Sequence, residues 1–375
     1  MIKLNCLFPI YCKNHAVSHA FYSLTNAWQG PDIQARMVVP NCIPECRGSN
    51  LVEAVPRLLK RFYYGNPATP VAMAEKRFLK DLKKFDAAHI WPGTTLDVIE
   101  KTKKMDKPIF LERINTFTGN SKRILQEAHD RLGVPFQTGL TPERIAQEKT
   151  ELELADFVFC PSPEAIKSYK EVGVPDEKII PTSYGWDPDL FPSVHAEKPP
   201  SEGFTLLFIG SVGVRKGIHL LLRAWERAEI KGRLIIYGHI EPVIAETCQD
   251  LLKLPNVVYR DFSDQYSFAY READLFALPS LEEGSPLVTY EAMAHGLPML
   301  VSPMGGGGIV RDGVDGMVIP PYEEDAWVEA LRKFAQNPDL CQKFGESGRQ
   351  WVQEFTWEKV AARRAVPMLE RLKAA

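Results

Sequence analysis

One stretch of this chain decides its fold, and it reads Asp274-Leu275-Phe276-Ala277-Leu278-Pro279-Ser280 followed, after two residues, by Glu283-Gly284-Ser285-Pro286-Leu287-Val288-Thr289-Tyr290-Glu291. The first part is a short apolar run of the kind that forms a buried strand. The second part is a Gly-Ser-Pro turn that runs into a helical pattern from Leu287 to His295. The first N–H groups of a helix have no partner within it, and the helix dipole favours negative charge there. The stretch therefore predicts a strand–turn–helix unit with an anion site at its turn.

Two acidic residues within this unit indicate what else the site binds. Glu283 lies in the turn, and Glu291 lies on the first turns of the predicted helix. Both carboxylates accept hydrogen bonds, so they suit sugar hydroxyls rather than phosphate. The combination predicts a pocket for a ligand that carries both phosphate and hydroxyl groups, which is a sugar nucleotide.

A second unit of the same design occupies Leu206–Trp225. It reads as a strand, a glycine-containing turn with Arg215 and Lys216, and a helix with regular apolar spacing. Gly210 and Gly213 allow the backbone to approach a ligand closely, and the two cations add positive charge at a helix start, which favours phosphate. The stretch contains neither a P-loop nor a convincing Gly-x-Gly-x-x-Gly fingerprint. Taken alone, such a turn is more often part of the surface than a site.

Short apolar runs alternate with helical patterns along most of the chain, which favours βα units and parallel sheets. The length of 375 residues suggests two domains, and the polar, proline-containing stretch His195–Gly203 is the best linker candidate. We expect an α/β protein with two Rossmann-like, doubly wound parallel-sheet domains whose strand carboxyl ends face one cleft. The strand candidates are 3–8, 35–39, 87–91, 108–111 and 157–160 in the first half and 205–210, 233–237, 256–259, 275–278, 299–301 and 316–319 in the second.

The composition is that of an ordinary globular protein, with 45% hydrophobic and 25% charged residues. The net charge of −3 gives no reason to expect nucleic acid as a partner, and no run approaches the roughly 18 apolar residues of a membrane span. The seven cysteines are scattered, which fits a reducing compartment, so we expect a cytoplasmic protein. Cys42 and Cys46 are the one close pair. Without further ligands nearby, they are interpreted as unrelated loop cysteines, and no metal is expected.

The segment 56–84 is unusually basic. From Arg57 to Lys84 it carries eight Lys or Arg residues against two acids, with aromatic and leucine side chains interleaved. Such a segment can lie on an anionic membrane, which would make the protein peripheral to the inner membrane face. The alternative, which we favour, is a solvated helix pair whose apolar side packs on the first sheet.

In its C-terminal half the chain resembles the retaining glycosyltransferases of family 4, also called group 1, which have the GT-B architecture. The resemblance rests on blocks that occur in the order of the family. They are 208–225 with its Arg215-Lys216-Gly217 turn, 272–298 with two glutamates in the E-x7-E spacing, 312–316 and 355–360. The N-terminal half is similar more loosely, at 155–162, 173–179 and 184–187.

The resemblance implies a role for each residue of the two turns. Arg215 and Lys216 would contact the diphosphate of the donor, and Glu283 would bind hydroxyls of the transferred sugar, so these three form the implied catalytic set. Glu291 would bind the ribose hydroxyls. The other donor-binding residues that the resemblance implies are Ser211, Gly213, Arg260 near the base, Gly284, Ser285, and Leu287 and Val288 through their N–H groups.

The resemblance also implies an activity of the hexosyltransferase type (EC 2.4). A sugar would pass from a nucleoside-diphosphate sugar to an acceptor hydroxyl, with retention at the anomeric carbon and without a metal or other cofactor. Residues 1–195 would bind the acceptor, which is a saccharide, a lipid-linked compound or a small molecule. Residues 204–355 would bind the donor, and the helix within 356–375 would cross back to the first domain.

Two alternatives stay open. The same scaffold could serve a sugar phosphorylase, or a transferase that uses a sugar phosphate. The chain could also bind a nucleotide sugar without catalysing a reaction.

Four places depart from the family pattern, and one of them is the loop 9–19 after the first strand, which lacks the usual glycines. Ser211 stands where an arginine is common, and Gly308 stands where a glutamate is common. The run of four glycines that ends at Gly308 is either a close approach at the ligand or a flexible turn. The stretch 112–116 stands where many members have a histidine. Its side chains could face the transferred sugar, or Glu112 and Arg113 could form a structural ion pair, which we favour.

Overall fold

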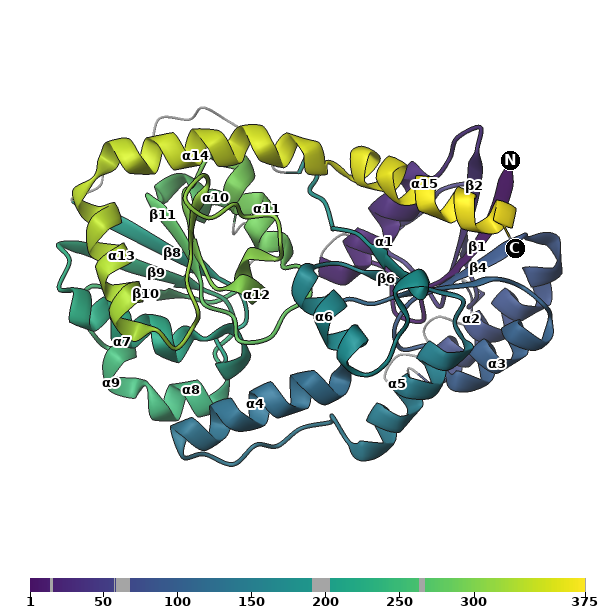
Figure 1. The fold of residues 1–375 in the computed structure, drawn as a ribbon, viewed down its shortest axis with the longest axis horizontal. Coiled ribbons are helices and arrows are strands. Elements are labelled where there is room, and N and C mark those ends of the chain that lie inside the picture. Colours follow the sequence, from purple (N-terminus) through teal and green to yellow (C-terminus); the bar gives the residue numbers. More distant parts are fainter. Residues whose placement is uncertain (14–15, 57, 59–67, 191–202, 263–266, 375) are drawn as a thin grey trace.

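The computed structural model describes residues 1–13, 16–56, 58, 68–190, 203–262 and 267–374, and Figure 1 shows two α/β domains side by side along the long axis. The strands are β1 (Ile2–Leu7), β2 (Ile33–Val39), β3 (Leu51–Glu53), β4 (Ala87–Ile90), β5 (Ile109–Glu112), β6 (Phe157–Cys160), β7 (Ile179–Pro181), β8 (Phe204–Ile209), β9 (Gly232–Tyr237), β10 (Val257–Arg260), β11 (Leu275–Leu278), β12 (Met299–Val301) and β13 (Gly316–Val318). The α-helices are α1 (Ala16–Ala27), α2 (Ala68–Asp81), α3 (Leu96–Lys104), α4 (Thr118–Leu132), α5 (Pro142–Leu154), α6 (Pro163–Glu171), α7 (Ile218–Ala228), α8 (Pro242–Thr247), α9 (Gln249–Leu252), α10 (Ser267–Glu272), α11 (Leu287–Ala294), α12 (Pro303–Gly306), α13 (Glu324–Gln336), α14 (Pro338–Val352) and α15 (Trp357–Ala374). Short 3-10 turns include η5 (Val214–Lys216) and η6 (Gln353–Phe355).

Both sheets are doubly wound. Within the described residues, the first has seven strands in the order β3-β2-β1-β4-β5-β6-β7, and the second has six in the order β10-β9-β8-β11-β12-β13. In this described part of the chain, neighbouring strands of both sheets pair in parallel. The predicted fold class is therefore confirmed. In each sheet the strand order reverses beside the first strand, between β1 and β4 and between β8 and β11, and such a reversal opens a crevice for ligands at the strand carboxyl ends.

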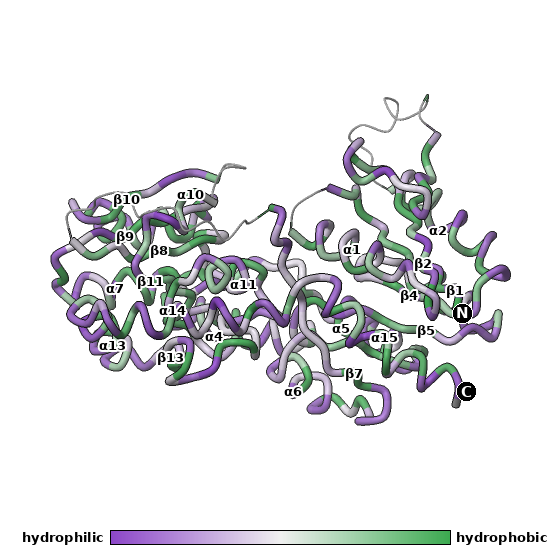
Figure 2. The backbone as a smooth tube through the Cα atoms, turned by 90° about the horizontal axis from the view of Figure 1, so that it is seen from above, coloured by the Kyte–Doolittle hydropathy of each residue, from purple (hydrophilic) through white to green (hydrophobic). Residues whose placement is uncertain are grey.

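Each of the eleven predicted strands overlaps an observed strand, and 157–160, 275–278 and 299–301 agree at both ends. The prediction missed β3 and β7, which have three residues each and lie at the two edges of the first sheet. Buried runs such as Leu275–Leu278 have every residue inside, because helices cover both faces of a parallel sheet. In Figure 2 such hydrophobic segments run through the interior of both domains.

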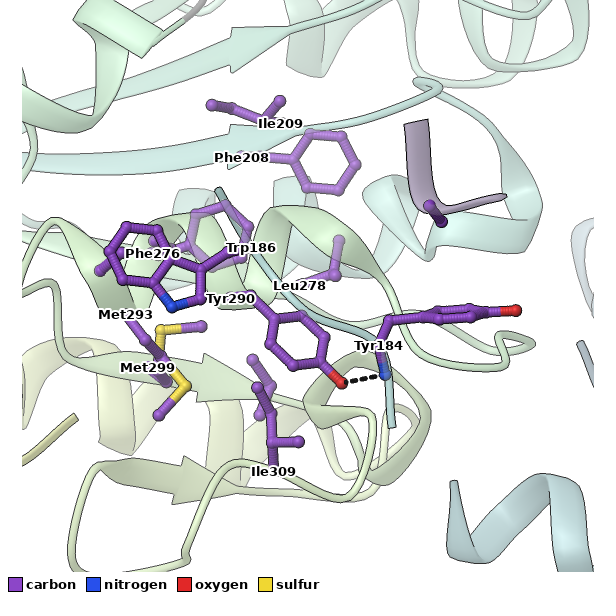
Figure 3. Close-up of a cluster of buried hydrophobic side chains, with 14 of the residues drawn as sticks. Tyr184, Trp186, Phe208, Ile209, Phe276, Leu278, Tyr290, Met293, Met299 and Ile309 are labelled. Atoms are coloured by element: carbon purple, nitrogen blue, oxygen red, sulfur yellow. Dashed lines mark hydrogen bonds between the residues drawn. The ribbon is translucent and has the colours of Figure 1, made fainter. Parts of the chain in front are cut away.

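The segment that ends the first domain, around Tyr184 and Trp186, packs against the second domain. Figure 3 shows Tyr184 and Trp186 of the first half lying over α11 and β11 of the second, where Tyr290 accepts a hydrogen bond from the Tyr184 N–H at 3.1 Å. Trp186 Nε1 donates to the Val352 carbonyl at 2.9 Å. The expected linker His195–Gly203 lies almost entirely outside the described residues, since 191–202 are not described.

The last helix, α15, lies against α1 of the first domain (Figure 1). Trp28 Nε1 donates to the carbonyl of Ala361 at 2.8 Å. Arg364, with 2% of its surface exposed, pairs with the buried Glu112 at 2.8 Å. The helix therefore contributes both a hydrogen-bond acceptor and a buried counter-ion to a domain that begins more than 300 residues earlier.

The basic segment 56–84 is described only in part, because 57 and 59–67 lie outside the described residues. Its described helix, α2, buries Phe78 and lies on the first sheet, where Asn5 of β1 donates to the Phe78 carbonyl at 3.2 Å. Arg77 on the same helix pairs with Asp81 at 2.7 Å. This packing is what the favoured alternative predicts for α2, and contact with lipid stays a prediction.

Candidate functional site

The two predicted turns meet at the reversal point of the second sheet. The turn after β8 contains η5, and the turn after β11 leads into α11. The Leu281 N–H donates to the Arg215 carbonyl at 2.9 Å, which joins the turns directly. Gly217 has a φ of +70°, and a Cβ at this position would collide with the carbonyl of Pro279. Glycine is therefore needed here for both its backbone conformation and its size.

Opposite charges concentrate where the turns meet. Glu283 Oε1 lies 2.5 Å from Lys216 Nζ and 2.8 Å from Arg215 Nη1. The Lys216 and Glu283 side chains are only 10% and 7% exposed, whereas Arg215 is 35% exposed. Burial lowers the pKa of the Lys216 ammonium, and the neighbouring Glu283 acts in the opposite direction. The structure thus brings together the three residues of the implied catalytic set.

Helix α11 presents its first N–H groups beside these charges. Leu287 and Val288 are its first two residues, and Pro286 precedes them as the N-cap. The N–H groups of Leu287 and Val288 have no acceptor within the helix, because the first four N–H groups of any α-helix lack a helical carbonyl four residues before them. Glu291, further along the helix, is 6% exposed, and its Oε2 accepts a hydrogen bond from the Tyr270 hydroxyl at 2.7 Å.

Ser285 and Gly284 contact other parts of the molecule. Ser285 Oγ lies 2.7 Å from the Tyr290 hydroxyl, which also contacts the Tyr184 N–H. A Cβ at Gly284 would collide with the carbonyl of Ile114 in the first domain. The donor turn expected from the sequence is therefore pressed against the loop that follows β5.

Ser211 and Gly213 lie on the first turn beside a residue that the sequence interpretation missed. Ser211 Oγ donates to Glu241 Oε1 at 3.0 Å, and a Cβ at Gly213 would collide with the Glu241 carboxylate. Although burial opposes the change, Glu283, Glu282 and Glu241 together raise the pKa of Arg215. Glu241 lies just beyond β9, and no motif in the sequence connects it with the turn.

Arg260 stands apart from this cluster. It ends β10 and forms a two-point ion pair with Glu272, with distances of 3.0 and 3.1 Å. This pairing raises the pKa of Arg260 and lowers that of Glu272. A contact of Arg260 with a base stays a prediction, and its observed partner is Glu272.

Glu282 is a second residue that the interpretation missed. It is 2% exposed, and its Oε1 accepts hydrogen bonds from the Thr116 N–H at 3.2 Å, Thr116 Oγ1 at 2.8 Å and Ser121 Oγ at 3.0 Å. Its carbonyl accepts from Arg215 Nη1 at 3.2 Å. The acidic pair Glu282-Glu283 was visible in the sequence, but the first-domain partners of Glu282, Thr116 and Ser121, lie more than 160 residues away.

The stretch after β5 is structural at its first two positions. Glu112 is fully buried between His89 Nε2, at 3.0 Å, and Arg364, at 2.8 Å. Burial would raise the pKa of Glu112, but these two partners hold it below its ordinary value. Arg113 is 4% exposed and pairs instead with Glu151 at 2.9 Å. Both residues form structural ion pairs, as the favoured interpretation expects, but the expected pairing of Glu112 with Arg113 is wrong.

Gly308 makes a close approach to the other domain. Its φ is +75°, and a Cβ there would collide with Pro163 at the start of α6. The glycine run is therefore a place of close contact between the domains. A glutamate at this position would not fit without movement of Pro163.

Among the residues that the structure describes, no group of three or more His, Cys, Asp or Glu side chains is arranged to hold a metal ion. In the same part of the chain, no helix has the length and apolarity needed to cross a membrane.

The second domain matches a known family model. Residues 203–337 fit the model described as glycosyl transferases group 1. A D-inositol 3-phosphate glycosyltransferase of Streptomyces coelicolor is 31% identical over 183 residues, which are 44% of this chain and 40% of that protein. The chain thus spans about two fifths of the length of this relative.

The whole chain is similar to solved structures. Sucrose-phosphate synthase from Thermosynechococcus elongatus superposes with a TM-score of 0.75 over 100% of both chains at 19% identity. Anabaena HepE, solved in complex with UDP and glucose, superposes with a TM-score of 0.68 over 100% of both chains at 14% identity. At such identities the likeness concerns the fold, and it confirms the expected GT-B architecture.

Proposed function

We propose that this chain transfers a sugar from a nucleoside-diphosphate sugar to an acceptor hydroxyl, with retention at the anomeric carbon and without a metal cofactor. One observation carries the proposal: Arg215, Lys216 and Glu283 meet at the reversal point of the second sheet, beside the start of α11. The match of residues 203–337 to a glycosyltransferase model supports the same conclusion.

The chemistry requires a site that stabilises negative charge on the leaving group. When the bond between the anomeric carbon and the diphosphate oxygen breaks, the electron pair stays on the diphosphate and the sugar becomes oxocarbenium-like. Two cations and the N–H groups of Leu287 and Val288 would face that charge. Groups that are fixed in advance stabilise developing charge without the cost of reorganising solvent.

The carboxylates would serve the hydroxyl groups of the donor. Glu283 would accept hydrogen bonds from the transferred sugar once the diphosphate draws Arg215 and Lys216 toward itself. Glu291, held by the Tyr270 hydroxyl, would accept from the ribose. The acceptor hydroxyl forms the new bond to the anomeric carbon, and its proton passes to the departing diphosphate.

The first test identifies the donor by ligand-dependent stability. UDP, GDP and ADP, and then the sugar derivatives of the base that binds, are added in a thermal-shift assay with and without EDTA. We expect one nucleoside diphosphate to raise Tm equally in both conditions, because ligands that bind only the folded state stabilise it. Absence of any shift would contradict the proposal, and a shift that disappears in EDTA would contradict metal independence.

The second test separates the proposed activity from its alternatives. Release of the nucleoside diphosphate and the anomeric configuration of the product are followed by NMR. Retention in the product supports the proposal. If the donor binds but is neither transferred nor slowly hydrolysed, the chain is better described as a binding protein. Phosphate-dependent release of sugar phosphate would instead favour a phosphorylase.

Beside the favoured packing of 56–84 on the first sheet, we propose as a second candidate that this segment contacts anionic lipid, which would place a cytoplasmic protein at the inner membrane face. The net positive charge of this segment supports it. Co-sedimentation with anionic vesicles at low salt tests it, and a protein that stays in the supernatant would refute it.

A further inference from the structure

Glu282 is a buried carboxylate whose hydrogen bonds cross between the domains. Three donors from the first domain, Thr116 N–H, Thr116 Oγ1 and Ser121 Oγ, converge on its Oε1 at 3.2, 2.8 and 3.0 Å. The residue belongs to the turn after β11 in the second domain and is 2% exposed. A buried carboxylate is costly unless it is hydrogen-bonded or paired. Glu282 is therefore satisfied chiefly when the two domains are together.

The second oxygen of Glu282 faces the cations of the site. Oε2 lies 3.6 Å from Arg215 Nη1, and the same nitrogen donates to the Glu282 carbonyl and pairs with Glu283. Glu282 thus lies between the loop after β5 and a residue of the proposed diphosphate site. Its neighbour Glu283 pairs with Arg215 and Lys216. Two consecutive acids of one turn therefore have different main partners, the first domain for Glu282 and the cations of the site for Glu283.

The backbone fits the two domains together at the same point. At Gly284 the turn touches the carbonyl of Ile114 closely enough that a Cβ would collide. Thr116 follows this contact by two residues, and Ser121 lies on the first turns of α4. The hydrogen bonds to Glu282 and the contact at Gly284 together fix where the first domain meets Glu283.

We propose that Glu282 is a positioning residue that fastens the loop after β5 to the donor turn and so holds the acceptor-binding domain over the reacting sugar. This inference rests on the proposed function for its effect on catalysis. In this role Glu282 would act through the loop after β5 and through Arg215, and not by direct contact with the donor. Its loss would leave the donor site of the second domain assembled but would let the first domain move away from it.

The test removes one hydrogen-bond donor of the first domain and leaves the cations of the site in place. Thr116→Val deletes a hydroxyl, and its matched control is Thr102→Val, because Thr102 is also a fully buried threonine whose hydroxyl bonds only within its own domain, to the Val98 carbonyl at 2.8 Å. We expect Thr116→Val to lower kcat about tenfold, as loss of one hydrogen bond to a charged group would. The Kd of the nucleoside diphosphate that binds the wild type should stay within about twofold.

Glu282→Ala gives the second half of the experiment, because alanine has no side-chain oxygen to accept from Thr116. If Thr116 acts through Glu282, the double variant should be no slower than Glu282→Ala alone, because the two changes remove one interaction. Additive losses would overturn the inference, and so would an unchanged kcat in Thr116→Val. An equal loss in Thr102→Val would show that the effect is a general one on the fold.

A measurement without turnover separates this inference from the proposed function. Spin labels at the exposed positions Lys104 and Glu329 report the distance between the domains. We expect Thr116→Val to add longer distances, and Thr102→Val to leave the distribution as it is. Unchanged distances would refute the role of Glu282 even in an active enzyme. If the wild type binds no nucleoside diphosphate, the proposed function fails. The measured distances would still show whether the contact between Thr116 and Glu282 holds the two domains together.

Discussion

Lys216 keeps its ammonium group where little water reaches it. Its side chain is 10% exposed, and its nearest partner is Glu283 Oε1 at 2.5 Å. Burial disfavours the charged form, and the carboxylate offsets that effect in part. A lysine in this setting is already oriented, so a diphosphate that exchanges with Glu283 would meet a fixed cation.

We expect Lys216→Ala to lower kcat/KM by about 10²–10³, because loss of one oriented group that stabilises the leaving charge has typically cost that much. The measurement is transfer or donor hydrolysis, with the fold checked by circular dichroism. Lys333→Ala, which removes an exposed lysine from α13, is the control. A near wild-type rate for Lys216→Ala would remove Lys216 from the site.

His219 predicts how stability depends on pH. It is 2% exposed on α7, and burial, with smaller effects of Arg223 and His129, lowers its pKa to about 4 from an ordinary 6.5. Between those values the unfolded chain binds more protons than the folded one, so stability falls as pH drops from about 6.5 toward 4. The full difference corresponds to about 3 kcal/mol.

The variant His219→Gln should lose less stability over this interval than the wild type, as measured by urea unfolding at pH 7 and pH 4.5. His239→Gln, at an exposed position, should follow the wild type. Parallel pH profiles for His219→Gln and the wild type would contradict the assignment.

At the scale of elements, the meeting of two turns depends on the backbone at Gly217. This residue ends η5, begins α7 and touches the Pro279 carbonyl after β11. The parallel order β8-β11 places both turns at one edge of the sheet, and Gly217 lets them touch. The site is therefore assembled by strand order first and by side chains second.

Gly217→Ala should destabilise the protein by about 1–3 kcal/mol more than Gly133→Ala, because it adds a collision with backbone to the same unfavourable φ. Gly133 is a suitable control, since its φ is +68° and a Cβ there would meet nothing within 4 Å. Unfolding in urea measures both. Equal losses would show that the contact with Pro279 has no energetic weight.

Elements of this fold differ in how visible they are in the sequence. Runs such as Leu275–Leu278 are fully apolar because they are buried on both faces, so they stand out. The edge strands β3 and β7 have three residues each and end in Glu53 and Pro181, so they lack the fully apolar run by which the equally short β12 stands out. The turns with Lys216 and Glu283 were visible through composition and family pattern. The roles of Glu241 and Glu282 were not visible, because a residue that matters through a distant partner carries no local signal.

At the scale of the whole molecule, α15 completes the first domain. Arg364 on this helix is buried and neutralises Glu112, which also contacts His89. The next residue toward the N-terminus, Arg363, is exposed and lies 5.1 Å from the Phe355 ring. Two neighbouring arginines on one helix thus have opposite environments.

Arg364→Leu should lower the free energy of unfolding by about 3–5 kcal/mol, because it leaves Glu112 buried without its counter-ion. Arg363→Leu should change it by less than about 1 kcal/mol. Urea unfolding followed by tryptophan fluorescence measures both variants. Similar values for the two would mean that Glu112 finds another partner or becomes protonated.

The return of the chain to its starting domain also sets an order in time. Trp28 and Glu112 of the first domain have their partners, Ala361 and Arg364, on α15. The core of the first domain is therefore incomplete until the segment 357–374 has been synthesised. The second domain has its six strands by residue 318. The half that leaves the ribosome later is therefore the half that can finish folding first, and the earlier half must stay incomplete, and in need of protection from aggregation, while it waits.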